Sequence, residues 1–170
     1  NTTAHDNTAV GYKSLNANTT GTYNVGVGCS ALAANTTADK NTAVGYHALK
    51  SNTTGEKNTA FGYNALLDIT TAVRNTAVGS GALANSTAND NTAVGSNCAD
   101  AITTGSKNVA MGSYALTTAT TGSENTAIGF DSLKNNTTAS YNTAVGTNAL
   151  LSNTTGALNT AIGAWALDAN

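Results

Sequence analysis

A five-residue segment, NTAVG or a close variant of it, recurs ten times along the chain at an almost constant interval. Eight of the nine intervals are 17 residues, and the interval from Asn75 to Asn91 is 16. A fixed period of this length is typical of a repeat protein in which every copy occupies the same place in a stack. The sequence therefore predicts a single repeat array over residues 1–170, with copies starting at Asn7, Asn24, Asn41, Asn58, Asn75, Asn91, Asn108, Asn125, Asn142 and Asn159.

The residues that fill the repeat favour β-structure over a stack of helical hairpins. We number the positions of one repeat 1 to 17, with the consensus NTAVGYxALxxNTTGxx, and call the same position in successive repeats a column. Thr, Val, Asn and Gly recur in every copy, and these residues disfavour helix. The chain is therefore expected to be all-β: a parallel β-solenoid of about ten 17-residue coils, on the order of 50 Å long at about 4.8 Å per coil.

Two apolar columns are predicted to form the core. Position 9 is Leu in nine copies, including Leu49 and Leu66, and position 2 alternates between Thr and Val. Because side chains alternate along a strand, position 2 is expected to share the inward side with position 4. Position 12, mainly Asn, is expected inward or at a corner, and position 14, which is Thr, is expected on the same side of a second strand. The predicted position-4 core residues are Val10, Val27, Val44, Phe61, Val78, Val94, Met111, Ile128, Val145 and Ile162.

Position 5 is Gly in every copy. An unvarying Gly column indicates a corner where the backbone needs positive φ or a close approach between coils. The predicted corner glycines are Gly11, Gly28, Gly45, Gly62, Gly79, Gly95, Gly112, Gly129, Gly146 and Gly163.

The charged residues support the same winding. All sixteen Lys, Arg, Asp and Glu residues fall at positions 7, 10, 11, 16 or 17, and His5 and His47 obey the same restriction. In a solenoid only outward positions tolerate charge, so these five columns are predicted to face water.

Several function classes are disfavoured. A net charge of −2 offers no footprint for nucleic acid or an anionic membrane, and no apolar run is long enough to span a bilayer. The two His residues lie in different columns without a regular partner, so we expect no enzyme activity, no metal and no cofactor. Column 17, which runs Asp6, Tyr23, Lys40, Lys57, Arg74, Asp90, argues against regular calcium loading.

Other residues have a structural interpretation beside a functional one. Cys29 and Cys98 lie four coils apart, so they are expected to be free thiols, with an interchain role as the alternative. The Asn-x-Ser/Thr motifs are interpreted as a structural column rather than glycosylation sites. The aromatic residues could make a surface or glycan contact, with corner packing or an interchain contact as the favoured interpretation. The motifs begin at Asn1, Asn18, Asn35, Asn52, Asn85, Asn136 and Asn153, and the possible contact residues are Tyr12, Tyr46, Tyr63 and Trp165.

A thin interior leaves little surplus of stability for a single chain. The other side of the strand presents the small residues of positions 1, 3 and 5, for example Asn41, Ala43 and Gly45. Alternation along the strand predicts that these residues face outward. We therefore expect this side to pack against identical chains in a homotrimer. Both ends interrupt a repeat, which is the pattern of a segment of a longer array with end-to-end contacts.

The repeat also resembles a known group of proteins. The segments NTAVGYHAL (41–49), NTAFGYNAL (58–66) and NTAIGAWAL (159–167) resemble repeats in the shafts of bacteriophage and other viral tail-fibre proteins. They are similar as well to the head repeats of trimeric autotransporter adhesins. The resemblance implies a left-handed parallel β-roll, three chains per fibre and a role in reaching a host surface.

Three functions remain open at this level. The first is the shaft of an extracellular or virion attachment fibre, in which flanking regions contact a host glycan or receptor. The second is a self-assembling extracellular filament or matrix protein. The third, an ice-binding solenoid, is disfavoured because Thr19 and Thr53 are followed two residues later by Gly21 and Gly55, which breaks a TxT array.

Overall fold

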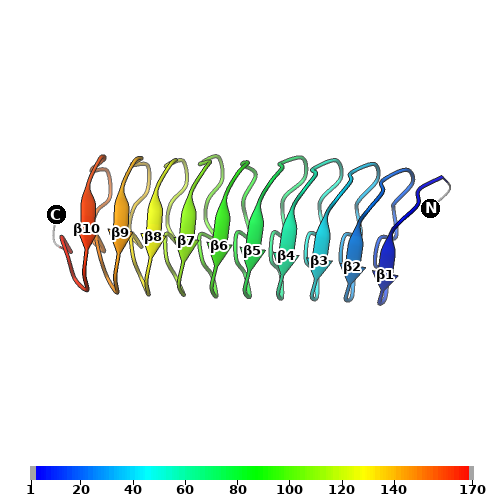
Figure 1. The fold of residues 1–170 in the computed structure, drawn as a ribbon, viewed down its shortest axis with the longest axis horizontal. Helices are drawn as coiled ribbons and strands as arrows, with labels where there is room; N and C mark the ends of the chain where they lie inside the picture. Colours follow the sequence, from blue (N-terminus) through cyan, green and yellow to red (C-terminus); the bar gives the residue numbers. More distant parts are fainter. Residues whose placement is uncertain (1–2, 169–170) are drawn as a thin grey trace.

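The computed structural model describes residues 3–168, which form a parallel β-solenoid. Each repeat contributes one three-residue strand, and the ten strands follow chain order in one sheet (Figure 1). No helix occurs within the described residues. The strands are β1 (Thr8–Val10), β2 (Val25–Val27), β3 (Thr42–Val44), β4 (Thr59–Phe61), β5 (Thr76–Val78), β6 (Thr92–Val94), β7 (Val109–Met111), β8 (Thr126–Ile128), β9 (Thr143–Val145) and β10 (Thr160–Ile162).

Residues one period apart lie beside one another in the sheet. Val44 pairs with Phe61 at the usual 17-residue interval, and Thr76 pairs with Thr92 across the 16-residue interval without a change of register. The predicted fold class, with about ten coils of 17 residues, is confirmed.

The interior is built from the small residue of each strand and the Leu column. Ala43 and Ala60, at position 3, and Leu49 and Leu66, at position 9, have no exposed surface. The Leu column was predicted correctly, and the burial of the Ala column was missed.

The prediction that position 4 is core is wrong for the single chain. Val10 is 56% exposed and Phe61 is 55% exposed, whereas the Ala between positions 2 and 4 is buried in every strand from β3 to β10. Positions 1, 3 and 5 therefore do not form an outer face. The exposed members of column 4 are Val10, Phe61, Val78, Met111, Ile128 and Ile162, and the half-buried members are Val27, Val44, Val94 and Val145.

The narrowness of the coil explains the inversion. Gly26 occupies position 3 of its repeat, the middle of strand β2, and a Cβ added there would lie 2.5 Å from the Ser14 hydroxyl oxygen and 3.4 Å from Cγ of Leu15. The opposite wall is so close that the strand has room for a methyl group or less. The period of two was read correctly from the sequence, but the larger side chains face out because Leu from the far wall fills the interior.

Gly at position 5 is required on two grounds. Its φ lies between +120° and +143° in all ten copies, a region that residues with a Cβ rarely adopt. A Cβ at Gly79 would also lie 2.3 Å from the carbonyl oxygen of Gly95 in the next coil. The corner-glycine prediction is confirmed.

Bulkier residues also adopt positive φ at the other bends. Positions 7, 9 and 17 are left-handed, and at position 9 this includes the buried Leu49 and Leu66, each with φ of 51°. Such a conformation costs about 1–2 kcal/mol for a residue with a Cβ. It persists because the Leu49 amide donates to the Ala65 carbonyl of the next coil at 3.0 Å while the side chain is sealed inside.

Asn at position 1 forms a ladder inside the solenoid. The Asn41 side-chain amide donates to the Gly55 carbonyl oxygen at 2.8 Å, and its Oδ1 accepts the backbone N–H of Asn58 at 2.9 Å. The same pair of contacts recurs from coil to coil, so the buried amides and the backbone groups they meet are satisfied.

Position 12 is buried as predicted, but position 14 is not. Asn35 and Asn52 are fully buried, whereas Thr20 and Thr54 are exposed. The expected second strand is absent from residues 3–168, because the chain bends here and turns the Gly or Ala of position 15 inward. Thr at position 13 stabilises the bend, since the Thr53 hydroxyl donates to the Thr70 carbonyl at 3.0 Å.

We predict that adjacent substitutions on one strand have opposite effects. In Ala77→Asp a charge is buried without a partner, so the free energy of unfolding should fall by about 4 kcal/mol or more. In Val78→Asp the charge faces water, and the change should stay within about 1 kcal/mol. Chemical denaturation followed by circular dichroism, at a dilution where the chain is monomeric, measures both. Equal destabilisation would contradict the assigned orientation.

A second prediction concerns the Asn ladder. In Asn108→Ala the Gly122 carbonyl and the Asn125 amide lose buried partners, which should cost about 1–3 kcal/mol for each group. The matched variant is Asn52→Ile, because column 12 already changes to Ile69 in the next coil and leaves Asn52 Oδ1 without a partner. Its effect should be smaller, and thermal unfolding of the two variants would show the order.

Candidate functional site

The outward side of the ten strands forms a uniform surface along the solenoid. We call the position-2 and position-4 side chains of β1–β10 the sheet face. Position 2 is Thr in eight strands and Val in two, and position 4 is Val or Ile in eight, with Phe61 and Met111 as the exceptions. No Lys, Arg, Asp, Glu or His belongs to it, so the sheet face is apolar and weakly polar along its whole length.

The sheet face is large for an uncovered surface. Ten strands at about 4.8 Å make it about 50 Å long, and two outward side chains per strand make it about 10–15 Å wide. Its area is therefore on the order of 600 Å². That matches the largest apolar patches on soluble monomers, about 300–600 Å², and approaches the ~800 Å² that each partner buries in a standard interface.

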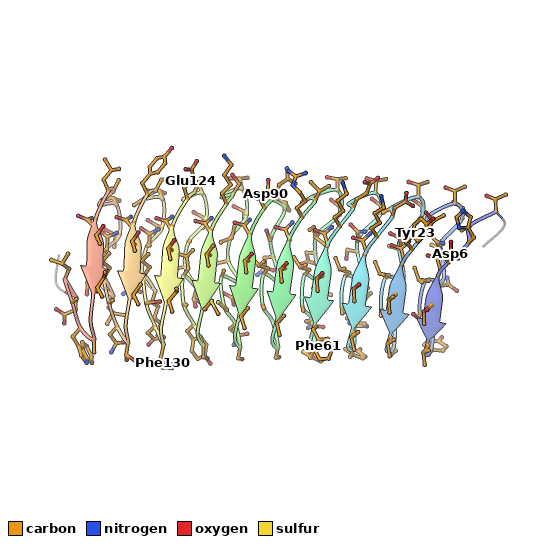
Figure 2. The ribbon with its side chains drawn as sticks, in the orientation of Figure 1. Asp6, Tyr23, Phe61, Asp90, Glu124 and Phe130 are labelled. Atoms are coloured by element: carbon orange, nitrogen blue, oxygen red, sulfur yellow. The ribbon has the colours of Figure 1, made fainter. Side chains whose placement is uncertain are left out.

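Charges lie along one long edge of the sheet face. Figure 2 shows this edge, just before the strands begin, with the acidic residues Asp6, Asp90 and Glu124. The neutral Tyr23 shares the same column. Lys107 lies 3.7 Å from Glu124 in the neighbouring coil. These groups are exposed, so such pairs contribute little to stability and chiefly keep this edge hydrated. As predicted, no charged residue is buried among the described residues.

The opposite edge carries the aromatic residues of positions 6 and 7, and Figure 2 shows Phe61 and Phe130 along it. The Tyr46 and Tyr63 rings stack in parallel at 5.4 Å between centroids, with 7° between their planes. Tyr46 also stacks on His47 at 3.7 Å. Partial desolvation and, secondarily, the charge of Lys50 lower the pKa of His47.

The four predicted contact residues are exposed, but the structure does not gather them into one site. Tyr46 and Tyr63 lie together, Tyr12 belongs to the first coil with Lys13 over its ring at 5.3 Å, and Trp165 belongs to the last. The contact of Tyr114 with Phe130, a ring pair 6.3 Å apart across neighbouring coils, was missed. Residues 16 apart in sequence lie at neighbouring positions of adjacent coils, so the repeat period alone could have predicted this contact.

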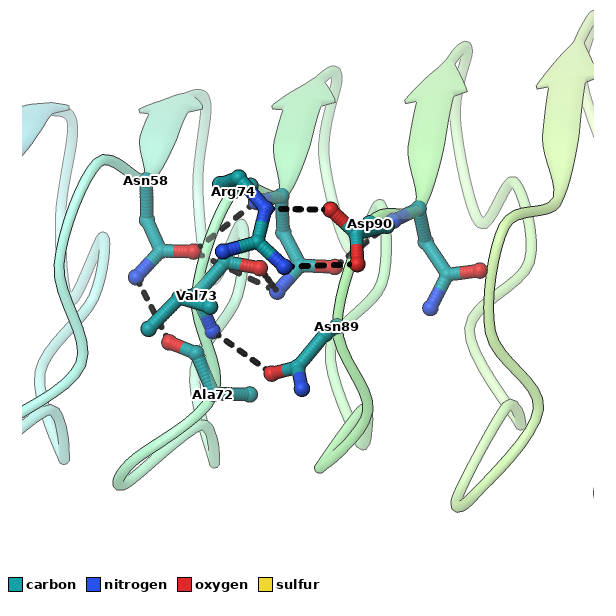
Figure 3. A network of polar contacts seen from close by, with 8 residues as sticks. Asn58, Ala72, Val73, Arg74, Asn89 and Asp90 are labelled. Atoms are coloured by element: carbon teal, nitrogen blue, oxygen red, sulfur yellow. Dashed lines mark hydrogen bonds and ion pairs between the residues drawn. The ribbon is translucent and has the colours of Figure 1, made fainter.

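The 16-residue coil has its own set of contacts, shown in Figure 3. Here the Asn75 side-chain amide donates to Asn58 Oδ1 and to the Val73 carbonyl oxygen. In other coils the position-1 Asn donates instead to the carbonyl oxygen of position 15, as Asn41 does to Gly55. Arg74 forms a bidentate pair with Asp90 across the two coils, at 2.5 and 2.9 Å. Hydrogen bonding to Arg74 lowers the pKa of the Asp90 carboxyl, and hydrogen bonding to Asp90 raises the pKa of the Arg74 guanidinium.

The chemically reactive residues are isolated from one another. Cys29 and Cys98 are free thiols, as expected, and burial raises the pKa of Cys98 to about 12, so its thiol is protonated at neutral pH. Among residues 3–168 there is neither a pocket nor a group of three His, Cys, Asp or Glu residues that could hold a metal ion. The described residues also include no helix of the length and apolarity needed to cross a bilayer.

The Asn-x-Ser/Thr motifs are mostly internal. The buried Asn residues face the interior and bond to their own coil, as Asn136 does through the Ala139 carbonyl at 3.0 Å. Asn85 differs because it is exposed at position 11 of the short coil, and the motif at Asn1 lies outside the described residues. The structural interpretation is supported for the buried members Asn18, Asn35, Asn52, Asn136 and Asn153.

None of three comparisons, with models of known protein families, with curated proteins and with solved structures, found a match to this chain.

A pH-dependent prediction follows from Asp100. Asp100 is half-buried; this partial loss of water raises the pKa of its carboxyl, and its Oδ1 has no hydrogen-bond partner. The folded state is therefore penalised above the folded pKa, and the penalty vanishes as the pH falls below the ordinary Asp value of about 3.9. In Asp100→Ala the new residue is Ala, which column 10 already has at Ala33 and Ala84. This variant should have a higher Tm than the unaltered chain at pH 7 and lose that gain near pH 3.

The control for this experiment is Asp68→Ala, which removes an exposed carboxylate from the neighbouring column. Its Tm should follow the unaltered chain at both pH values. A gain for Asp100→Ala that is the same at pH 3 and pH 7 would show that ionisation of Asp100 is not its source.

Proposed function

We propose that this chain is the non-enzymatic repeat shaft of a fibrous attachment protein, exposed on a virion or outside a cell, that holds a receptor-binding tip away from its base. The observation that carries this proposal is the uninterrupted pairing of ten coils along one axis. Each coil is hydrogen-bonded to the next through strand, corner and internal Asn contacts. An elongated body joined in this way suits a spacer.

The chemistry of the surface agrees with a spacer. Charged residues of both signs follow one another along one edge, from Lys40 to Glu124 in column 17, and the described residues form no pocket that would enclose a small substrate. Contact with a host glycan or receptor is therefore assigned to regions that flank this array. The resemblance of the NTAVGYHAL-type segments to tail-fibre and adhesin repeats supports the same assignment.

The partners in this proposal are two further copies of the chain, which pack through the sheet face. The sequence argument placed this contact on positions 1, 3 and 5, but the Asn and Ala side chains of positions 1 and 3 are internal, so the proposed surface moves to positions 2 and 4. Three features support it: the area approaches that of a standard interface, charge is absent, and exposed apolar residues such as Phe61 and Ile162 would be covered.

Two other functions would use the same sheet face. An ice-binding solenoid is favoured by the outward Thr column of position 2, which with column 4 makes a regular Thr-x-Val array. Against it, Phe61 and Met111 project from column 4 and interrupt a flat surface. A matrix filament would use the same sheet face without a tip or a base.

We predict that Val78→Asp abolishes self-association without unfolding the coil. Three unpaired charges brought together at a dry interface would be strongly unfavourable. Native mass spectrometry should give three chains for the unaltered protein and one for the variant, with the same circular dichroism spectrum. Thr104→Asp places the same charge on the exposed column 14 and should leave the trimer intact. A monomeric unaltered chain would contradict the proposed assembly.

The shaft function is tested on the native assembly. Antibody fragments raised against this array should label the stalk of a virion-borne or cell-borne fibre in electron micrographs. Labelling along filaments that have neither base nor tip would favour the matrix alternative. Thermal hysteresis at micromolar protein would instead support ice binding.

A further inference from the structure

We propose that Phe61 and Met111 set the axial register between parallel copies of the chain that pack through the sheet face. This inference rests on the self-association proposed above. It assigns to two residues a role that the repeat as a whole cannot perform.

The need for such residues comes from the uniformity of the coils. Every position-5 Gly has φ between +120° and +143°, and every position-9 residue has φ between +49° and +55°. Sliding one chain along another by one coil, about 4.8 Å, therefore brings an almost identical backbone into place. Backbone shape alone leaves many registers nearly equal in free energy.

The side chains of the sheet face are almost as uniform. Eight strands present Thr at position 2, and eight present Val or Ile at position 4. The outward exceptions at position 4 are Phe61 on β4, 55% exposed, and Met111 on β7, 43% exposed. Phe61 is the largest side chain of the sheet face and Met111 is its longest aliphatic one, and all the other position-4 residues are β-branched. These two are therefore the strongest candidates to distinguish one level from another.

Only the in-register arrangement matches both large residues. With no shift, Phe61 lies level with Phe61 and Met111 with Met111. A shift of one coil brings Phe61 level with Val44 or Val78, which leaves a gap beside one ring and overfills the space beside another. A shift of three coils brings Phe61 level with Met111 but leaves the remaining Phe and Met mismatched. Each void and each overpacked contact disfavours the shifted arrangement.

An antiparallel pair is the main competitor. A twofold axis between β5 and β6 would place Phe61 opposite Met111 on both sides, in a favourable sulfur–aromatic contact. The position-2 exceptions favour the parallel arrangement instead. In it Val25 lies level with Val25 and Val109 with Val109, whereas the antiparallel pair sets Val25 opposite Thr143 and Val109 opposite Thr59.

The short coil does not explain the register. Its missing residue falls at the bend near Thr87, outside the sheet face, and the strand pairing of Thr76 with Thr92 continues across it. The face that a second copy would contact is therefore continuous at this level.

The test uses disulfide trapping between two differently tagged chains. Both carry Cys29→Ser and Cys98→Ala, residues already found in columns 6 and 8. One chain carries Thr42→Cys or Val44→Cys on β3, and its partner carries either the same substitution or the one-coil equivalent, Val25→Cys or Val27→Cys on β2. After mixing and mild oxidation, the cross-linked heterodimers are counted by mass.

With Phe61 and Met111 present, same-level cross-links should exceed one-coil-offset cross-links by about tenfold or more, the ratio that a mismatch of about 1.4 kcal/mol would produce. In Phe61→Val/Met111→Val the ratio should fall towards one while three chains still assemble. Both substitutions install the commonest residue of column 4, so the coil itself should fold as before. The matched control is Val78→Ile, which keeps both markers and should keep the ratio.

Three results would overturn the inference. The first is equal same-level and one-coil-offset cross-linking in the chain that has Phe61 and Met111. The second is an unchanged cross-linking ratio in Phe61→Val/Met111→Val. The third is cross-linking between β3 and β8 when Val44→Cys is mixed with Ile128→Cys, which indicates an antiparallel pair. The first two results leave the proposed three-chain assembly standing, whereas an antiparallel pair would leave self-association but not the parallel trimer. A chain that stays monomeric would refute the proposed self-association, and with it the register.

Discussion

The structure depends on the stacking of each residue on its counterpart one period away. That stacking joins neighbouring strands in register, lets the Asn41 side chain satisfy both its own coil and the next, and brings Gly79 against the Gly95 carbonyl. Each contact is modest alone, at about 0.5–1.5 kcal/mol for a typical hydrogen bond. Repetition along the axis makes them mutually dependent, since a misplaced side chain in one coil removes partners from two.

A second constraint is the thinness of the coil. The two walls leave room for Ala from the strand and Leu from the opposite side, as Ala60 and Leu66 illustrate, so the larger apolar residues of the strands have no place inside. They form the sheet face. The thinness of the coil thus leaves these side chains outside, where the proposed self-association would cover them.

The candidate site was only partly predictable. The sequence indicated that charges lie in five outward columns and that Tyr46 and Tyr63 share a column, and both lie where that pattern places them. The sheet face was assigned to the wrong positions because Val at position 4 is apolar and was therefore interpreted as core. Hydrophobicity identifies a residue that avoids water, but it does not say whether its own chain or a second one covers it.

The sequence by itself determined the period, the parallel β-solenoid, the corner glycines and the buried Leu column, because a constraint repeated ten times appears as a column without reference to anything distant. Only the tertiary structure decided which side of the strand faces inward, which bends are left-handed and how Arg74 and Asp90 meet beside the short coil. Those features depend on the distance between the two walls of the coil. Alternation along a strand shows which side chains share a side, but it does not show which side faces inward. The distance between the two walls decides that, because only the smaller side chains fit inside.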